Sequence, residues 1–299
     1  MPLPDPFAEI RLLSLRSIRG ASLWSRRPVT RIDLHPGAYD EISSAEVPGF
    51  TEALLEALPE LWEHRCSVGE RGGFVTRLHR GTYAPHIVEH VGLALQNLAG
   101  HDVGYGRARG GDRPGEYTVV FEHLHAEVGL RAAALALETV QRALAGTLDG
   151  IDHPLAELRA LARTPEPPPF RFAVGCGITG GGDRGAARAE LLRRGVPADA
   201  LLVDVSPAYL LNAGLPYSSS KVALILDAEP ADVPERYRDP EMARKLVSVM
   251  ADAVPPGGIV VVPAGEWDVQ DRVLDAGRRV AAFTPEEGPS ARDARVSHA

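Results

Sequence analysis

The sequence predicts an α+β domain followed by an α/β domain with a mostly parallel sheet. In the first half, strand-like and helix-like runs follow one another without strict alternation, which is typical of α+β layers. In the second half, short apolar strands alternate with helices, which favours a parallel sheet covered by helices. Between the halves, the stretch from Arg163 to Pro169 holds four prolines, which favour an extended linker.

The length and composition suit a two-domain globular protein. The chain has 299 residues, of which 44% are hydrophobic and 24% charged. It can therefore bury a core, and a disordered chain or a coiled coil is excluded as the main state. We place the first domain at 1–162, the linker at 163–170, the second domain at 171–285 and a flexible tail at 286–299. The tail is predicted to fray because its residues are small and polar.

Each element of the first domain is predicted from its apolar spacing and its ends. Apolar residues of the segment 50–61 recur close to every 3.6 residues, which indicates a helix. The segment 86–98 has proline just before it and glycine shortly after it, as helices commonly do. The predicted strands are 10–18, 29–34, 74–79 and 116–123, and the predicted helices are 50–61, 86–98 and 127–144.

The second domain is predicted as alternating strands and helices. A glycine-rich turn follows its first strand, and a helix follows that turn. The strands are apolar enough to be buried on both faces, which indicates a parallel sheet. The predicted strands are 172–174, 200–205, 221–226, 258–263 and 280–283, and the predicted helices are 186–194 and 241–253.

Charge and cysteine content narrow the function classes. The formal net charge is −8, which argues against nucleic-acid binding. No apolar stretch approaches the ~18 residues of a membrane span, and the N-terminus lacks the pattern of an export signal. The two cysteines, Cys66 and Cys176, are therefore expected to be reduced thiols. We expect a cytoplasmic protein without a membrane partner.

The sharpest local pattern is His86-Ile-Val-Glu89-His90. Residues four apart lie on one face of a helix, so both imidazoles can reach one ion. Two neutral histidines with an acidic third ligand suit Zn²⁺ with one open position, and Glu89 can act as a general base beside it. The order H-x-x-E-H is that of the inverzincin peptidases. A partly buried pair of histidines bonded to carboxylates explains the spacing equally well.

A third metal ligand is expected from outside this helix. Glu122 ends a predicted strand and Glu127 opens the next helix, so these two are the candidates, with Glu138 as a weaker one. The alternative for Glu127 is a negative charge that stabilises its helix N-terminus. Cys66 is a possible ligand or nucleophile, although a small buried side chain is its simplest role.

Two glycine- and arginine-rich stretches flank the histidine helix. They begin at Arg71-Gly72-Gly73 and at Gly104-Tyr-Gly-Arg107. Glycines let the backbone approach a ligand, and arginines bind carboxylates through two hydrogen bonds. We expect Arg71, Gly72, Gly73 and Arg107 to bind substrate. Ordinary turns with solvated arginines are the alternative.

Eight short motifs follow one another in a specific order between about residues 15 and 144. They are Arg19-Gly-Ala-Ser-Leu-Trp-Ser25, Val47-Pro-Gly-Phe50, Leu58-Pro-Glu-Leu61, His64-Arg-Cys-Ser67, Arg71-Gly-Gly-Phe74, His86-Ile-Val-Glu-His90, Gly104-Tyr-Gly-Arg107 and Tyr117-Thr-Val-Val-Phe-Glu122. Together they resemble the N-terminal domain of cyanophycin synthetase. Cyanophycin is a storage polymer with a polyaspartate backbone and an arginine on each side chain. The resemblance implies polymer binding and, as in some members, a zinc-peptidase-like site on His86 and His90 with Glu89 as base.

The second domain resembles a shortened Mur-ligase central domain, which is a Rossmann-like α/β fold. Thr179-Gly180-Gly-Gly182-Asp-Arg184-Gly-Ala stands where that family has T-G-x-x-G-K-T-T. A phosphate loop needs its lysine on the phosphates and its hydroxyl on Mg²⁺, but here Arg184 and Gly185 take those places. The ATP-grasp domain of the whole synthetase has no counterpart between the two domains. The resemblance thus implies a degenerate loop without ATP and Mg²⁺ binding or ligase activity.

Two functions from different classes follow. In the first, the protein is a metal-dependent hydrolase of cyanophycin or a similar Arg/Asp peptide polymer. In the second, it is a catalytically inactive accessory protein that binds the polymer or a full-length synthetase. Residual ATP binding is a weaker third function, because arginine does not replace lysine at a tight phosphate site. A homo-oligomer is expected in each case.

Overall fold

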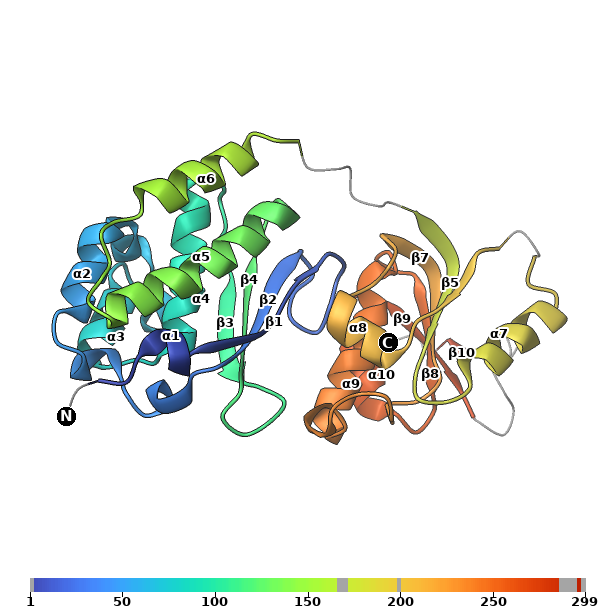
Figure 1. The fold of residues 1–299 in the computed structure, drawn as a ribbon. Coiled ribbons are helices and arrows are strands. Elements are labelled where there is room, and N and C mark those ends of the chain that lie inside the picture. The colour runs from blue at the N-terminus through green and yellow to red at the C-terminus, as the bar shows by residue number, and fades with distance from the viewer. Residues whose placement is uncertain (1–2, 166–171, 198–199, 285–294, 297–299) are drawn as a thin grey trace. The chain divides into compact units, whose positions relative to one another are not determined.

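Two β-sheets organise the computed structural model (Figure 1). The structure describes residues 3–165, 172–197, 200–284 and 295–296. The chain forms two compact units: Met1–Ser17 with Arg27–Pro167, and Ile18–Arg26 with Pro168–Ala299. The first unit combines an antiparallel sheet with helices, whereas the second alternates parallel strands with helices. The predicted fold classes, α+β and then α/β, are confirmed.

The first unit contains a four-stranded sheet in the order β1-β2-β4-β3. Strand β4 pairs antiparallel with both β2 and β3. The strands are β1 (Arg11–Ile18), β2 (Val29–His35), β3 (Gly106–Gly110) and β4 (Tyr117–Glu122). The helices are α1 (Pro6–Glu9), α2 (Phe50–Ala57), α3 (Gly73–Arg80), α4 (Ala84–Leu98), α5 (Ala126–Leu144) and α6 (Asp152–Ala162).

Helices α4 and α5 pack against this sheet and against each other. Val119 and Phe121 of β4 are fully buried in the core that the sheet shares with these helices. A methyl group on Gly92 of α4 would lie 2.6 Å from the Phe121 ring, so only glycine allows this approach. This contact holds the helix that carries the predicted metal ligands directly against the sheet.

The second unit contains a sheet in the order β10-β9-β8-β7-β5-β6. Strands β5 to β9 are parallel to their neighbours, and β10 pairs antiparallel with β9. The strands are β5 (Ala173–Thr179), β6 (Leu202–Asp204), β7 (Ser219–Ile225), β8 (Ile259–Pro263), β9 (Arg279–Phe283) and β10 (Arg295–Val296). The helices are α7 (Arg184–Arg193), α8 (Pro207–Ala213), α9 (Pro240–Ser248) and α10 (Trp267–Asp275).

The strand order places a topological switch point between β5 and β7. The chain runs from β5 outward to β6, then returns to the other side of β5 as β7. In open α/β sheets, ligands bind beyond the carboxyl ends of the strands at such a point. The glycine-rich loop at residues 180–183 follows β5, so it lies where a ligand would be expected.

Several predicted elements differ in the structure. The predicted strand 74–79 is wrong, because α3 occupies this segment; Phe74, Val75 and Leu78 are buried on one helical face. The predicted helix 50–61 ends at Ala57, since Pro59 starts a separate 3₁₀ helix, η3 (Pro59–Glu63). The helices and strands with no counterpart among the predicted elements are α1, β3, α6, α8, α10 and β10. The predicted helix 241–253 ends at Ser248 and continues as a 3₁₀ helix.

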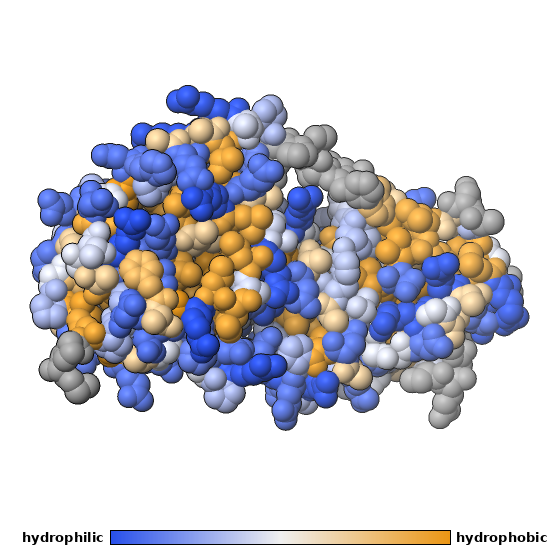
Figure 2. Space-filling view, viewed as in Figure 1, coloured by the Kyte–Doolittle hydropathy of each residue, from blue (hydrophilic) through white to orange (hydrophobic). Residues whose placement is uncertain are grey.

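Some of the predicted segments lie outside the residues that the structure describes. Residues 166–170 of the predicted linker and most of the predicted tail are among them. On the face seen in Figure 2, hydrophilic and hydrophobic side chains are interspersed over both units. Among the described helices, none combines the length and the apolar character that a bilayer crossing requires.

Candidate metal centre

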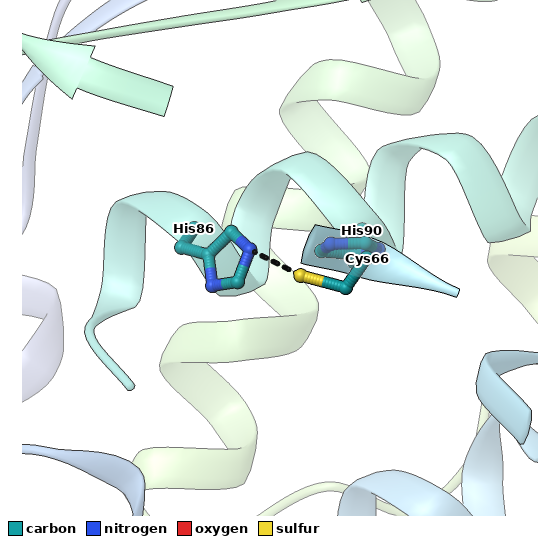
Figure 3. A group of neighbouring side chains, drawn as sticks. All are labelled: Cys66, His86 and His90. Carbon is teal, nitrogen blue, oxygen red and sulfur yellow. Dashed lines mark hydrogen bonds between the residues drawn. The ribbon is translucent and has the colours of Figure 1, made fainter. Parts of the chain in front are cut away.

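Helix α4 presents His86 and His90 one turn apart on the same side. Their ring centroids lie 4.8 Å apart. Cys66, from the 3₁₀ helix η4 (Cys66–Val68), places its Sγ 3.3 Å from Nε2 of His86 (Figure 3). One ligand atom from each of these three residues lies within 4.8 Å of the others. We call these three residues the Cys–His–His group.

Cys66 reaches the histidines through an unusual backbone conformation. Its φ is +51°, and among the described residues no other non-glycine residue has a positive φ. A non-glycine residue in this left-handed region costs of order 1 kcal/mol, and such strain concentrates at functional sites. This backbone directs the thiol toward helix α4.

The outer nitrogens of both histidines have hydrogen-bond partners. Nδ1 of His86 lies 2.8 Å from Oγ1 of Thr82. Nδ1 of His90 lies 2.8 Å from Nδ1 of His64. The Phe74 ring stacks on the His90 ring, with centroids 3.9 Å apart. Each imidazole is thus held in one orientation, with its other nitrogen left for a ligand.

Burial keeps these imidazoles neutral. It lowers the pKa of His64 and of His86 to about 4. The pKa of His90 is also lowered, mainly by burial and further by the neighbouring His86 and His64. Neutral imidazole has the lone pair that a metal ion requires, so the site does not have to lose a proton from these rings at neutral pH.

Glu89 is buried beside these ligands, with 6% of its surface exposed. Burial raises its pKa to about 7, although Arg107 and the backbone N–H of Ala108 favour the charged form. A carboxyl group that titrates near neutral pH can both accept and return a proton. The carboxylate lies against Gly106 of the edge strand β3. This stretch was predicted to bind substrate, with an ordinary turn as the alternative.

The Cys–His–His group and Glu89 line one cavity of about 890 Å³. Its wall carries charges of both signs. The cationic side chains are Arg65, Arg77, Arg107 and Arg109, and the acidic ones besides Glu89 are Glu60 and Glu63. Such a cavity can hold a cation at one point and a ligand with both carboxylate and guanidinium groups around it.

The predicted third ligands lie elsewhere. Glu122 is buried, but its carboxylate lies 3.7 Å from Arg27 and accepts a 3.4 Å hydrogen bond from the backbone N–H of Tyr105. Glu127 is exposed in the first turn of α5. Glu138 pairs with Arg142. In the part of the chain that the structure describes, none of the three joins the Cys–His–His group, and Cys66 takes that place.

Of the four residues predicted to bind substrate, Arg107 lines the cavity, whereas Arg71, Gly72 and Gly73 are not among the described residues of its wall. Arg107 lines the cavity beside Glu89. Arg71 is exposed and pairs with Glu63, and it is not among the described residues of the cavity wall. Gly72 begins α3 with a φ of +78°, and a methyl group on Gly73 would lie 2.0 Å from the carbonyl oxygen of Arg65. These two glycines therefore serve the local fold that brings η4 and α3 together.

Two residues that contact the histidines had no role in the prediction from sequence. Oγ1 of Thr82 lies near Nδ1 of His86, only four residues further along the chain, whereas His64 stands 26 residues before its contact His90. The motif His64-Arg-Cys66 was the available signal for His64 and for one member of the Cys–His–His group. The sequence alone does not show that this motif lies beside helix α4, because helix α3 separates the two in the chain and brings them together in the fold.

The glycine-rich loop of the second unit is occupied by a side chain of its own unit. The backbone N–H groups of Gly181 and Gly182 each donate a 2.7 Å hydrogen bond to the Asp227 carboxylate, which follows β7. The N–H of Glu229 donates to the same carboxylate at 3.0 Å. These loop amides are the groups that a phosphate loop offers to an anion.

The remaining loop residues are also engaged locally. Arg184 donates to the carbonyl oxygen of Gly180 instead of pointing away from the loop. Asp183 caps helix α7, accepting a 2.8 Å bond from the N–H of Ala186. Thr179 is buried and donates to the carbonyl oxygen of Val205 at 2.8 Å. The amides of Gly181 and Gly182 and the side chain of Arg184 thus have partners within the second unit.

Comparison with known proteins concerns the first unit. The chain is 45% identical over 153 residues to a cyanophycin synthetase of Trichormus variabilis, covering 50% of this chain and 16% of that protein. It is 42% identical over 153 residues to the one from Synechocystis sp., covering 50% of this chain and 17% of that protein. It is 40% identical over 154 residues to the one from Geminocystis herdmanii, covering 51% and 18%.

The chain therefore spans about a sixth of the length of the curated relatives it matches. A family model described as the cyanophycin synthase-like N-terminal domain matches residues 31–145. This stretch runs from within β2 to the end of α5, and hence includes both the Cys–His–His group and Glu89. The first unit of this chain is thus similar to the cyanophycin synthase-like N-terminal domain over residues 31–145.

Proposed function

We propose that the first unit is a metal-dependent, peptidase-type hydrolase that acts on cyanophycin or a similar Arg/Asp peptide polymer. The observation that carries this proposal is the convergence of Cys66, His86 and His90 in the wall of the cavity that also contains Glu89. Three protein ligands of the nitrogen and sulfur type leave a fourth position open, as in catalytic zinc sites.

The donor set fits Zn²⁺. Both imidazoles are neutral because burial lowers their pKa, and their outer nitrogens already have partners. The thiol of Cys66 lies next to Nε2 of His86, so a cation would replace a weak hydrogen bond. Cys66, His86 and His90 would hold the ion. When bound, it supplies Lewis-acid polarisation of a peptide carbonyl and makes a nearby water more acidic.

Glu89 acts as the proton carrier in this proposal. Its carboxylate accepts a proton from the attacking water and passes it to the leaving amine nitrogen as the peptide bond breaks. A pKa of about 7, raised by burial, suits both transfers at neutral pH. The N–H of Ala108 bonds to the carboxylate and orients it.

The charges of the cavity wall support a substrate with carboxylate and guanidinium groups. Arg107 and Arg109 can bind carboxylates with two hydrogen bonds each, and Glu60 can bind a guanidinium group. Cyanophycin is the polymer in the names of these relatives, the cyanophycin synthetases. An Arg/Asp polymer repeats both groups along its length, so a cavity with both signs of charge suits it.

The decisive experiment incubates the full chain with insoluble cyanophycin and zinc and follows soluble fragments. We expect release by the wild type and a loss of about 10²–10⁴-fold in Glu89→Gln, which removes the proton carrier. Glu127→Gln is the matched control, because Glu127 is exposed outside the group, and it should keep the activity. Equal release by the wild type and Glu89→Gln would exclude Glu89 as the base.

A second candidate function is polymer binding without hydrolysis. The arginines and glutamates of the cavity wall favour it, since they need no metal to bind a charged polymer. The chain would then act as an accessory protein to a synthetase. Sedimentation with the polymer, with no fragments released in the presence of zinc, would support this function over the first.

A further inference from the structure

His64 contacts His90 of helix α4 and lines the same cavity. It directly follows η3, and its Nδ1 lies 2.8 Å from Nδ1 of His90. The two ring centroids are 5.1 Å apart and the planes are tilted by 48°. The ligand atoms of the Cys–His–His group do not include His64. His64 therefore touches a candidate ligand without belonging to the group.

A hydrogen bond between two imidazole nitrogens holds one proton. Each neutral imidazole carries a proton on only one of its nitrogens, so one ring donates and the other accepts. A cation on Nε2 of His90 requires that nitrogen to be unprotonated. The proton of His90 is then on Nδ1, and it points to Nδ1 of His64, whose own proton is on Nε2.

His64 is itself held in place by the residue that stacks on His90. The backbone N–H of Phe74 donates a 3.2 Å bond to the carbonyl oxygen of His64. The Phe74 ring lies against the face of His90, at 3.9 Å and 20°. His90 is therefore fixed at one edge by His64 and on one face by Phe74, and these two residues are bonded to each other.

We propose that His64 is a positioning residue that sets the tautomer and the orientation of His90 for a bound cation. This inference rests on the proposed function, because it takes the Cys–His–His group to be a metal site. Ligand histidines usually donate their second N–H to an acceptor, and loss of that acceptor weakens metal affinity about 10–100-fold. Here the acceptor is an imidazole nitrogen.

The test measures the zinc dissociation constant of the full chain by competition with a coloured chelator. His64→Phe removes the acceptor, so we expect about 10–100-fold weaker binding. His64→Asn places an amide oxygen near the position of Nδ1 and should restore most of the affinity. His79→Phe replaces an exposed histidine of α3 and should change nothing. Thermal unfolding of each metal-free variant checks that the fold is kept.

Cobalt provides the second readout. The absorption bands of cobalt-saturated His64→Phe should match those of the wild type, because a positioning residue is not a ligand. Bands that report a lost nitrogen ligand would overturn the proposal, as would unchanged zinc affinity in His64→Phe while the wild type binds zinc. A wild type that binds no metal would instead refute the proposed function itself, and the role of His64 with it.

Discussion

The Cys–His–His group of the first unit and the glycine-rich loop of the second unit differ in what their donor atoms already contact. In the group, the outer nitrogens are bonded to Thr82 and His64, while the inner donors face one another at a cavity. In the loop, the amides of Gly181 and Gly182 are bonded to the Asp227 carboxylate.

This difference decides whether a motif is available to a ligand. Backbone amides at the end of a strand attract an anion. Here the Asp227 carboxylate, which follows the neighbouring strand β7, already supplies that negative charge. Histidines four apart on a helix can bind a cation, and here the supporting bonds leave the donors on one side. The same kind of short sequence pattern thus gives an open site in one unit and a closed one in the other.

The largest expected effect separates the two cysteines. Cys66→Ser removes a ligand of the proposed metal site, so we expect zinc affinity to fall by at least about 100-fold. Cys176→Ser is the matched control, because burial in the second unit raises the pKa of that thiol to about 12 and makes it a poor ligand. Zinc content per chain, measured on the purified variants, checks both.

The comparison would fail if the two variants behaved alike. Zinc retained in Cys66→Ser would mean that the histidines bind it with a different third ligand. Zinc lost equally in both variants would mean that the loss is not specific to the Cys–His–His group.

A smaller effect is expected when the loop loses its internal carboxylate. Asp227→Ala removes two charge-assisted hydrogen bonds to loop amides, so we expect the free energy of unfolding to fall by about 1–2 kcal/mol. Phosphate or sulfate should then raise the melting temperature of this variant more than that of the wild type, because the amides can accept an external anion. Differential scanning fluorimetry measures both changes.

The control for this prediction is Asp271→Ala, which removes an exposed carboxylate of α10. If phosphate or sulfate stabilises the wild type, Asp227→Ala and Asp271→Ala equally, the salt acts through the bulk solvent. Binding of the anion to the loop amides would then be excluded as the cause. Millimolar ATP with Mg²⁺ should leave the wild-type melting temperature unchanged. A clear rise would show that a nucleotide displaces Asp227.

Much of the site could be predicted because its main signal is local. The spacing of His86, Glu89 and His90 depends only on helix geometry, and the helix that carries them formed as predicted. Cys66 could not be connected to them, since the 19 residues between Cys66 and His86 (67–85) include the helix α3, where a strand was predicted. Glu122 and Glu127 were chosen because they lie near element ends, but Arg27 and solvent are their actual neighbours.

The strand pattern of the fold was predictable where apolar residues dominate. Strands β4 and β8 stand out by their valines. Strand β3 has the sequence Gly-Arg-Ala-Arg-Gly and lacks a run of apolar residues, because it is an edge strand beside the cavity. It forms a strand through its pairing with β4, which the sequence does not show. The role of Asp227 was equally invisible, since it depends on β5 and β7 being neighbours across a crossover.

The smallest effect is an acid sensitivity confined to the first unit. In the unfolded chain His64 and His86 bind protons near pH 6.5, whereas burial lowers their pKa to about 4 in the folded chain. Between these values the unfolded state binds more protons, so the free energy of unfolding falls as the pH falls. For partly exposed rings we expect about 1 kcal/mol in total between pH 7 and pH 5.

The second unit should not share this loss. All histidines except His298 belong to the first unit. Burial raises the pKa of Asp252 despite its ion pair with Arg26. Protonation of this carboxyl group at acid pH therefore stabilises the folded state of the second unit. Hydrogen exchange of the chelator-treated chain, resolved by peptide, measures each unit separately. The variant His64→Asn/His86→Asn should lose the part of the pH dependence that these two rings cause and keep the part that comes from His90, whose pKa burial also lowers. Equal acid destabilisation of both units in the wild type would show that the histidines of the first unit are not its source.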